Sequence, residues 1–291
     1  MKKSFFVLIA YLMTGLSACR EQSTQTDQTA GSDSSTAAPS SDWKLGVQMW
    51  TFHEFPFITA IEKTDSAGIK FIEAFPGQPL GGSLKGTFDI DMSAENQKAI
   101  RDLLQAKGIQ LVAFGVVVPP SMAVWRKTFA FAKEMQIQYI TAEPLKAHWD
   151  SVNILAGEFG IPIAIHDHPK PSPYDHPDSV IAAMNGRSNI YACADIGHWA
   201  RNGLDVVACL KQLEGRIYGA HLKDIKIFDK PDAEDTRLGT GVIKFPEVFQ
   251  ELKRQGFKGI FSIENEANWK NNVPDVLYNK KYFEDEISKL K

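Results

Sequence analysis

Residues 245–264 read FPEVFQELKRQGFKGIFSIE, and this stretch holds one complete helix-to-strand unit. Apolar residues recur at three- and four-residue spacing from Phe245 to Leu252, which is typical of an amphipathic helix. Gly256 follows the predicted helix 245–255, where a glycine in the left-handed conformation commonly ends a helix. The short apolar run 259–264 comes next and ends in a carboxylate. Such a unit indicates a parallel sheet whose strands are buried beneath helices.

The same alternation of short apolar runs and longer amphipathic runs continues outward from this unit. Gly68, Gly108 and Gly160 stand at further helix-to-strand joints, and residues 94–107 form another helical pattern. The predicted strands are 45–50, 70–75, 110–116, 139–143, 163–166, 190–195, 217–222 and 259–264. Eight units within residues 43–291 fit a single-domain α/β protein, a (β/α)₈ TIM barrel of about 250 residues. A doubly wound sheet would normally carry a glycine-rich phosphate loop after its first strand, and no such loop follows residue 50.

The first 42 residues have a different character from the rest of the chain. Lys2 and Lys3 precede an apolar run that is too short to span a bilayer and is typical of a secretory signal. The run ends in Leu16-Ser17-Ala18-Cys19, which resembles the lipobox of bacterial lipoproteins, although an ordinary signal peptide is the alternative. The resemblance implies cleavage before Cys19 and its lipidation. We expect a signal peptide at 1–18, a disordered tether at 19–42, rich in Ser, Thr and Gln, and the barrel at 43–291.

This N-terminus predicts an exported bacterial lipoprotein that faces the periplasm and touches the membrane only through its lipid anchor. Arg20 is not an acidic retention signal, which favours the outer membrane. The composition, 44% hydrophobic and 23% charged, excludes a wholly disordered chain. A net charge of −3 without a basic stripe argues against nucleic-acid binding. Three cysteines are too few for a disulfide scaffold, and we expect Cys193 and Cys209 to be free thiols.

Polar residues gather at the carboxyl ends of the predicted strands, where TIM barrels place their active sites. These residues are Glu73, Glu143, His166, His168, Asp195, His198, His221, Lys223 and Glu264. We expect Glu143, Asp195, His221 and Glu264 to converge on one divalent metal ion. Three carboxylates and one imidazole favour Mn²⁺, with Mg²⁺, Co²⁺, Fe²⁺ or Zn²⁺ as alternatives. A ring of solvated charges at the barrel rim is the other interpretation.

Four segments carry a resemblance to a known family: ITAEP around Glu143, ADIGH from Ala194, AHLKD from Ala220, and residues 239–264. They resemble the sugar isomerase/epimerase superfamily with xylose-isomerase-like TIM barrels, which includes 3-keto-glycoside lyases and hydratases. The resemblance implies that Glu143, Asp195, His221 and Glu264 bind the metal and that His198 contacts the substrate. The sequence His166-Asp167-His168 departs from the family pattern and leaves the substrate class open.

The shared chemistry of such sites is proton abstraction from the carbon next to a metal-bound sugar carbonyl. Glu143 and Glu264 are the predicted catalytic bases, with His198 as a third catalytic residue. The leading prediction is a sugar isomerase or epimerase, and the alternative is a 3-keto-glycoside lyase or hydratase. A third hypothesis belongs to another class of function: a sugar-binding lipoprotein that is not an enzyme. DNA repair by an endonuclease with this barrel is disfavoured by the near-neutral charge.

Other strand-end residues are expected to contact a small-molecule sugar or keto-glycoside. His166, His168, Lys223, Glu73 and Trp50 form the predicted substrate-binding set, although Glu73 could instead pair with a neighbouring cation. Aromatic residues near the strand ends, among them Phe75, Phe114 and Trp269, could form a wall for a sugar ring or could simply close the core. The sequence leaves the oligomeric state open.

Overall fold

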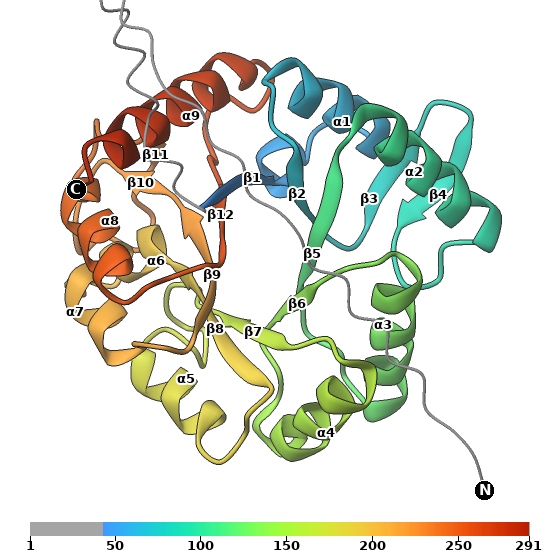
Figure 1. The fold of residues 1–291 in the computed structure, drawn as a ribbon, viewed down its shortest axis with the longest axis horizontal. Helices are drawn as coiled ribbons and strands as arrows, with labels where there is room; N and C mark the ends of the chain where they lie inside the picture. The colour runs from blue at the N-terminus through green and yellow to red at the C-terminus, as the bar shows by residue number, and fades with distance from the viewer. Residues whose placement is uncertain (1–42, 291) are drawn as a thin grey trace, which may run out of the picture. The chain divides into compact units, whose positions relative to one another are not determined.

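A computed structural model describes residues 43–290 of the chain. Eight parallel strands close into a barrel in the order β1-β12-β9-β8-β7-β6-β5-β2, and helices surround it (Figure 1). The predicted single-domain TIM barrel is therefore confirmed. The barrel strands are β1 (Lys44–Gln48), β2 (Phe71–Ala74), β5 (Gln110–Val117), β6 (Tyr139–Ala142), β7 (Ile163–His166), β8 (Ile190–Asp195), β9 (Ile217–Leu222) and β12 (Ile260–Ile263).

Each predicted strand overlaps one barrel strand, with small differences at the ends. The first strand stops at Gln48, two residues earlier than expected. The side-chain oxygen of Gln48 accepts a hydrogen bond from the amide of Trp50 at 3.1 Å, and this bond turns the chain into the 3₁₀ helix η1 (Met49–Phe52). As a result, Trp50 stands at the rim of the barrel instead of inside the sheet.

The helices lie between successive strands, as the alternation predicted. They are α1 (Phe57–Ser66), α2 (Ala94–Lys107), α3 (Met122–Glu134), η2 (Lys146–His148), α4 (Trp149–Phe159), α5 (Pro177–Met184), α6 (Ile196–Arg201), α7 (Val206–Gln212), α8 (Phe245–Arg254) and α9 (Val273–Ser288). Ser93 caps α2 by accepting the amide of Asn96. Gly108 ends the same helix with φ of 61°, a conformation that costs glycine little.

Two short antiparallel pairs are additions that the alternation did not predict. The hairpin of β3 (Gln78–Gly81) and β4 (Leu84–Phe88) lies between β2 and α2. Its sequence contains Pro79 and three glycines with positive φ, a composition typical of loops. The second pair, β10 (Asp224–Ile225) with β11 (Asp235–Thr236), follows β9.

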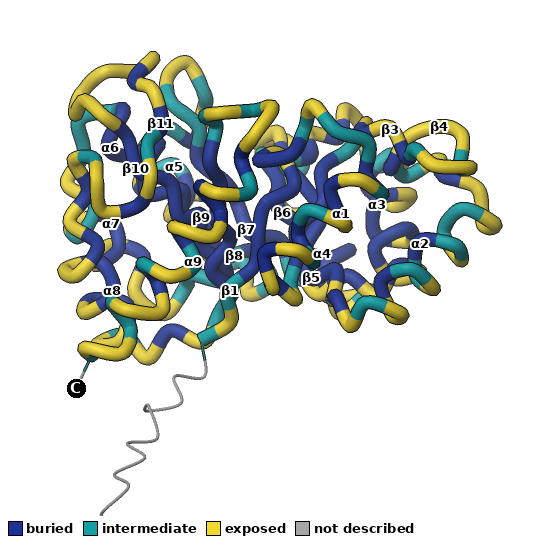
Figure 2. The backbone as a smooth tube through the Cα atoms, turned by 90° about the horizontal axis from the view of Figure 1, so that it is seen from above, coloured by how far each residue is buried: buried dark blue, intermediate teal, exposed yellow. Residues whose placement is uncertain are grey.

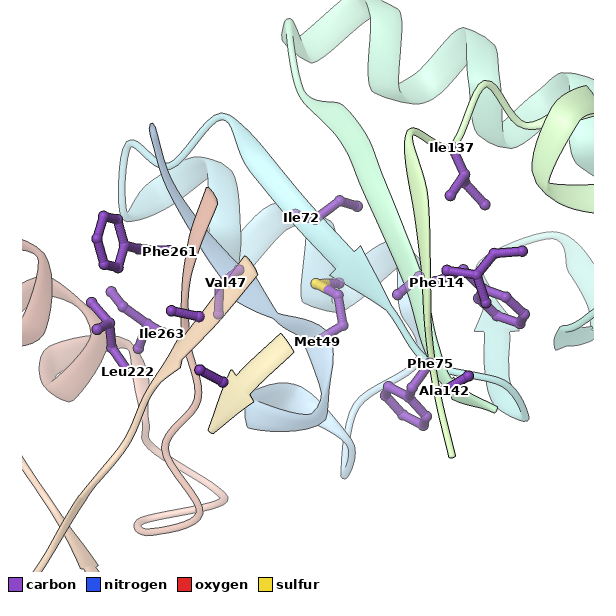
Figure 3. Packing of buried hydrophobic residues seen from close by; sticks show 14 of the residues in the cluster. Val47, Met49, Ile72, Phe75, Phe114, Ile137, Ala142, Leu222, Phe261 and Ile263 are labelled. Carbon is purple, nitrogen blue, oxygen red and sulfur yellow. The ribbon is translucent and has the colours of Figure 1, made fainter. Parts of the chain in front are cut away.

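The main apolar core fills the space between the barrel strands and the helices. In Figure 3, Val47, Ile72 and Phe261 are among the buried side chains that make up this layer. Figure 2 shows the same division along the backbone, with buried strands inside and exposed turns outside. Phe114 packs against Phe88 and Phe131 and is fully buried, so it closes the core and does not face a sugar.

The barrel interior is built in layers, because alternate side chains of each strand point inward. A small apolar cluster fills one layer: Val112, Ala113, Tyr139, Ala164, Cys193 and Ile260. Two residues further along their strands lie Thr141, His166, Asp195 and Ser262, all buried. In the strand pairing, Asp195 of β8 lies beside His221 of β9. Ser262 of β12 lies on the other side of His221. The register thus brings the polar ends of β8, β9 and β12 to one level.

Several expectations about the whole chain can be placed against the described residues. Cys193 and Cys209 are buried free thiols, as predicted. Among residues 43–290, no helix is long and apolar enough to cross a membrane. The predicted signal peptide at 1–18, the tether at 19–42 and the lipidated Cys19 lie outside the described residues.

Candidate active site

A cavity of about 380 Å³ opens at the end of the barrel where the strands terminate. Its volume falls within the range of small-molecule sites. The residues that line it come from the carboxyl ends of the strands and from the segments that follow them: Gln48, Trp50, Phe75, Pro76, Gly115, Val116, His166, His168, His198, Arg201, Glu264 and Glu266. This lining combines apolar walls with titratable groups, as enzyme pockets do.

Four buried side chains meet at this cavity: His166, Asp195, His221 and Glu264. One ligand atom of each lies within 4.8 Å of the corresponding atoms of the others. Three of them were predicted as metal ligands, and His166 takes the place expected for Glu143. Asp195 uses its other oxygen, Oδ1, to accept the amides of Gly197 and His198 at 2.9 and 3.0 Å. That bonding fixes the carboxylate and aims Oδ2 at the cluster.

The cluster fits a divalent cation. Asp195 Oδ2 and Glu264 Oε2 are buried and have no hydrogen-bond partner. Glu264 Oε2 lies 2.7 Å from His221 Nδ1 without hydrogen-bond geometry, and His221 Nδ1 lies 3.1 Å from His166 Nε2. Ligand atoms that face one another in this way are suited to a shared ion. Two imidazoles and two carboxylates suit Zn²⁺, Mn²⁺, Fe²⁺ or Co²⁺ better than Mg²⁺.

Glu73 lies behind His221 and does not line the cavity. Its Oε2 is 2.8 Å from His221 Nε2, and its Oε1 accepts a hydrogen bond from Thr141. The Glu73 side chain is fully buried. A sugar in the cavity would meet other groups first, because Glu73 is paired with the imidazole of His221 and with Thr141. The carboxylate holds the imidazole so that Nδ1 faces the cluster.

Glu143 lies outside the group of four. Its Oε1 accepts hydrogen bonds from His168 Nδ1 at 2.6 Å and from Ser172 Oγ at 3.0 Å. His168 lines the cavity, and its ring lies 4.5 Å from the ring of His166. The structure therefore joins Glu143 to the site through His168, as a carboxylate–imidazole pair.

Lys223 occupies the centre of the carboxylates instead of the cavity wall. Its ammonium lies 2.6 Å from Glu266, 3.2 Å from Asp195 and 3.3 Å from Glu264, and the side chain is fully buried. Burial alone would lower the pKa of Lys223, but these three carboxylates outweigh it and hold that pKa well above its ordinary value. Lys223 thus neutralises the carboxylates that surround the cluster.

Two further cavity residues, Arg201 and Glu266, were not among the predicted site residues. Arg201 Nη2 pairs with Asp235 at 2.6 Å, and its Nη1 lies 3.1 Å from His198 Nδ1. The signal in the sequence was the spacing of Arg201 three residues after His198, which places both on one face of a helix. For Glu266, the signal in the sequence was its position two residues after Glu264, a predicted site residue.

The buried histidines differ in their protonation. Burial, together with the charge of His168, holds the pKa of His166 well below its usual range. Burial and nearby Lys223 do the same for the pKa of His198, against the opposing effect of Asp195. Both rings are therefore neutral at pH 7, and a neutral imidazole is the form that binds a metal. For His221, burial alone would lower the pKa, but Cys193 and Glu73 outweigh it and raise the pKa well above its ordinary value.

Aromatic rings form one wall of the cavity mouth. Trp50 is 39% exposed and meets Phe75 edge-on at 5.0 Å, and both line the cavity. His53 stacks on Trp50 at 4.6 Å, and Trp269 touches His53 edge-on at 4.1 Å. Trp50 thus lies at the mouth of the cavity, and its contact with a substrate stays a prediction.

Comparison with known proteins agrees with this architecture. The family model of the xylose isomerase-like TIM barrel matches residues 61–289, and the chain belongs to this family. A putative uncharacterized protein from Parabacteroides distasonis is 35% identical, with a TM-score of 0.69 over 84% of this chain and 99% of that one. No curated protein matches the chain.

Two more distant structures share the fold. The IOLI protein with a bound zinc atom is 19% identical, with a TM-score of 0.70 over 85% of this chain and 99% of that one. A D-tagatose 3-epimerase-like protein is also 19% identical, with a TM-score of 0.66 over 84% of this chain and 97% of that one. At such identity the likeness concerns the fold.

Proposed function

We propose that this protein is a divalent-metal-dependent sugar isomerase or epimerase that moves a proton on a carbon next to a carbonyl. The convergence of His166, Asp195, His221 and Glu264 at the cavity carries the proposal. The zinc atom in the IOLI protein and the epimerase-like neighbour support it. A cation held by these four residues would stabilise negative charge that develops on a carbonyl oxygen of the substrate.

Two groups of the chain are placed to carry the proton. Glu264 lines the cavity; its Oε2 faces the cluster, and its Oε1 lies 3.3 Å from the ammonium of Lys223. His168 lines it as well, and the carboxylate of Glu143 fixes its ring through Nδ1. The two groups come from β12 and β7, strands that β9 and β8 separate in the barrel. One group can take the proton while the other returns it, which is what epimerisation requires.

Two cations of the chain lie at or beside the cavity, and each is paired with carboxylates. Arg201 lines the cavity and is held by Asp235 and by the backbone oxygen of Ala233. Lys223 lies directly behind Asp195 and Glu264. A fixed cation on a cavity wall stabilises negative charge that develops on a substrate without reorganisation.

Elimination or hydration of a 3-keto-glycoside is the second candidate. The pair of His168 and Glu143 favours it, because an imidazole held by a carboxylate can protonate a departing oxygen. Both reactions begin with removal of the same kind of proton. They differ in product, since isomerisation preserves the mass whereas elimination releases an aglycone.

Exchange of a substrate C–H with deuterated solvent tests the shared step. Full-length protein with Mn²⁺ is incubated with ketohexoses and 3-keto-glucosides in D₂O, and deuterium uptake is followed by NMR and mass spectrometry. We expect exchange in the wild type, none in Glu264→Gln, and full exchange in the surface control Glu62→Gln. A wild type that binds these sugars without any exchange would identify a binding protein and overturn the proposal.

A further inference from the structure

A second depression lies at the same end of the barrel as the cavity. It has a volume of about 560 Å³ and is lined by Glu54, Arg237, Asn268, Trp269, Lys270, Asn271, Pro274 and Asp275. These residues belong to the loops that follow β1 and β12 and to the start of α9 and the segment after β11. Because β1 and β12 are neighbours in the barrel, the two loops meet beside the active site.

A continuous strip of rings links this depression to the cavity. Trp50 lines the cavity, His53 stacks on it with rings inclined by 16°, and Trp269 meets His53 and lines the depression. Two ring contacts, of 4.6 and 4.1 Å, thus separate the wall of the cavity from the wall of the depression. A molecule with a second ring would cover that span.

The polar groups around Trp269 suit hydroxyl groups better than a single charge. The Nε atom of Arg237 donates to Asp275 Oδ1 at 2.5 Å, and Asn268 Nδ2 donates to Asp275 Oδ2 at the same distance. These bonds hold Arg237 and Asn268 in fixed positions. Both signs of charge are present, since Glu54 and Lys270 line the same depression. Neutral polyols with many hydroxyls bind to surfaces that combine an aromatic face with mixed planar donors and acceptors.

We propose that this depression is a subsite for the second ring of a glycoside, so that the preferred substrate carries an aglycone as well as the ring ketone that the proposed chemistry needs. The sugar that reacts lies in the cavity, and its aglycone, a further sugar or an aryl group, lies against Trp269. The assignment rests on the proposed function, because it takes the cavity as the place where a sugar reacts.

Paired ligands test the subsite. Binding of glucose and galactose, and of their α- and β-p-nitrophenyl glycosides, to the full chain with Mn²⁺ is measured by isothermal titration calorimetry. We expect at least one glycoside to bind about 5- to 10-fold more tightly than its free sugar, as one aromatic stacking contact would give. Trp269→Ala should remove this advantage and leave the affinity for the free sugar within about twofold. Trp269→Phe should keep most of the advantage, and Phe228→Ala, which changes an exposed ring on a different loop, should keep all of it.

The outcomes separate this proposal from the proposed function. Equal affinity for free sugars and glycosides, or equal weakening of both by Trp269→Ala, overturns the subsite and leaves the proposed function intact. Failure to bind any of the glycosides overturns the subsite, whereas the proposed function is overturned only by a wild type that shows no exchange with ketohexoses or 3-keto-glucosides.

Discussion

Glu73 Oε2 lies 2.8 Å from His221 Nε2, and this contact fixes which nitrogen of His221 faces the metal cluster. Donation of Nε2–H to Glu73 would leave the lone pair of Nδ1 for a bound cation, and Nδ1 lies 2.7 Å from Glu264 and 3.1 Å from His166. A carboxylate behind a ligating imidazole orients the ring and makes it a better ligand. Glu73 is therefore placed to support the candidate metal site without contacting the cavity.

Replacing Glu73 by Gln should weaken metal binding by about 10- to 100-fold, as removal of such supporting carboxylates does elsewhere. The dissociation constant for Zn²⁺ or Mn²⁺ is measured by competition with a chelator. Glu62→Gln, on the exposed side of α1, is the control and should bind as the wild type does. An unchanged dissociation constant for Glu73→Gln would show that His221 is not a ligand or needs no support.

Metal content distinguishes the observed cluster from the set expected from the sequence. We expect about one divalent ion per wild-type chain, none in Asp195→Ala, and about one in Glu143→Gln, because Glu143 lies outside the four-residue group. Mass spectrometry of the purified proteins measures all three. Loss of the ion in Glu143→Gln would show that Glu143 is a metal ligand, as the sequence predicted. A wild type that takes up no ion from Mn²⁺ or Zn²⁺ would contradict the metal site itself.

The fold could be predicted because its signals are local. Apolar runs of four to six residues, glycine joints and amphipathic helices recur along the chain, and each is set by residues close in sequence. The inward direction of Asp195 and His221, which lie within β8 and β9, also follows from alternation along a strand. The hairpin β3–β4 was not predicted, because Pro79 and the glycines of the hairpin are typical of a loop.

The site differs from the prediction at residues whose position is not set by the alternation of side chains along a strand. Strand β6 ends at Ala142, so the direction of Glu143 depends on the following loop. That loop is held by Tyr174, which bonds to the oxygen of Pro144 and accepts from Trp149 Nε1 at 2.7 Å. The position of Glu73 differs from the prediction for another reason. Glu73 lies within β2 and is therefore deeper in the barrel than the strand-end residues. Depth depends on strand tilt and stagger, which a single sequence does not display.

Acid should destabilise the protein partly through Glu251. The hydrogen bond from Arg254, opposed by burial and aided by Gln255, lowers the pKa of Glu251 to about 2. A carboxyl group whose folded pKa is below its unfolded value stabilises the fold above the unfolded pKa, near 4.5. This contribution is lost as the pH falls from there towards 2. Because Arg254 is half exposed, we expect only about 1 kcal/mol.

Urea unfolding of the wild type and Glu251→Gln at pH 7 and at pH 3 measures this contribution. The variant should be less stable by about 1 kcal/mol at pH 7, and the difference should shrink at pH 3. Lys98→Gln, which removes an exposed ion pair with Asp102, is the control. A difference that is the same at both pH values would mean that the bond to Arg254 does not depend on the charge of Glu251.

Cys19 carries the predicted lipid anchor, and this prediction rests on the sequence around it. In cells, the wild-type protein should incorporate labelled palmitate and sediment with membranes, whereas Cys19→Ser should do neither. Cys209→Ser, which changes a buried thiol of the barrel, should behave as the wild type in both assays. Equal labelling of Cys19→Ser and the wild type would contradict lipidation at Cys19.

His168 gives the sharpest test of how protons move in this site. Its ring lines the cavity, while its Nδ1 is held by Glu143 at 2.6 Å. If His168 carries a proton, His168→Gln should lower kcat by about 10²- to 10⁴-fold, the usual contribution of a general acid or base. His168 lies outside the four-residue cluster but could form a second group of metal ligands with His166 and His198. A metal content near that of the wild type is expected if the four-residue cluster holds the ion.

Glu143→Gln should reproduce part of this loss, since the amide can still contact the ring but no longer stabilises its positive charge. The pH dependence of kcat should then change in the same direction in both variants, which a purely structural role would not produce. His176→Gln, which changes an exposed histidine at the start of α5, should retain the wild-type kcat. A His168→Gln variant with wild-type turnover would leave Glu264 as the one proton carrier, and a single carrier that works on one face of the carbon favours isomerisation or elimination over epimerisation.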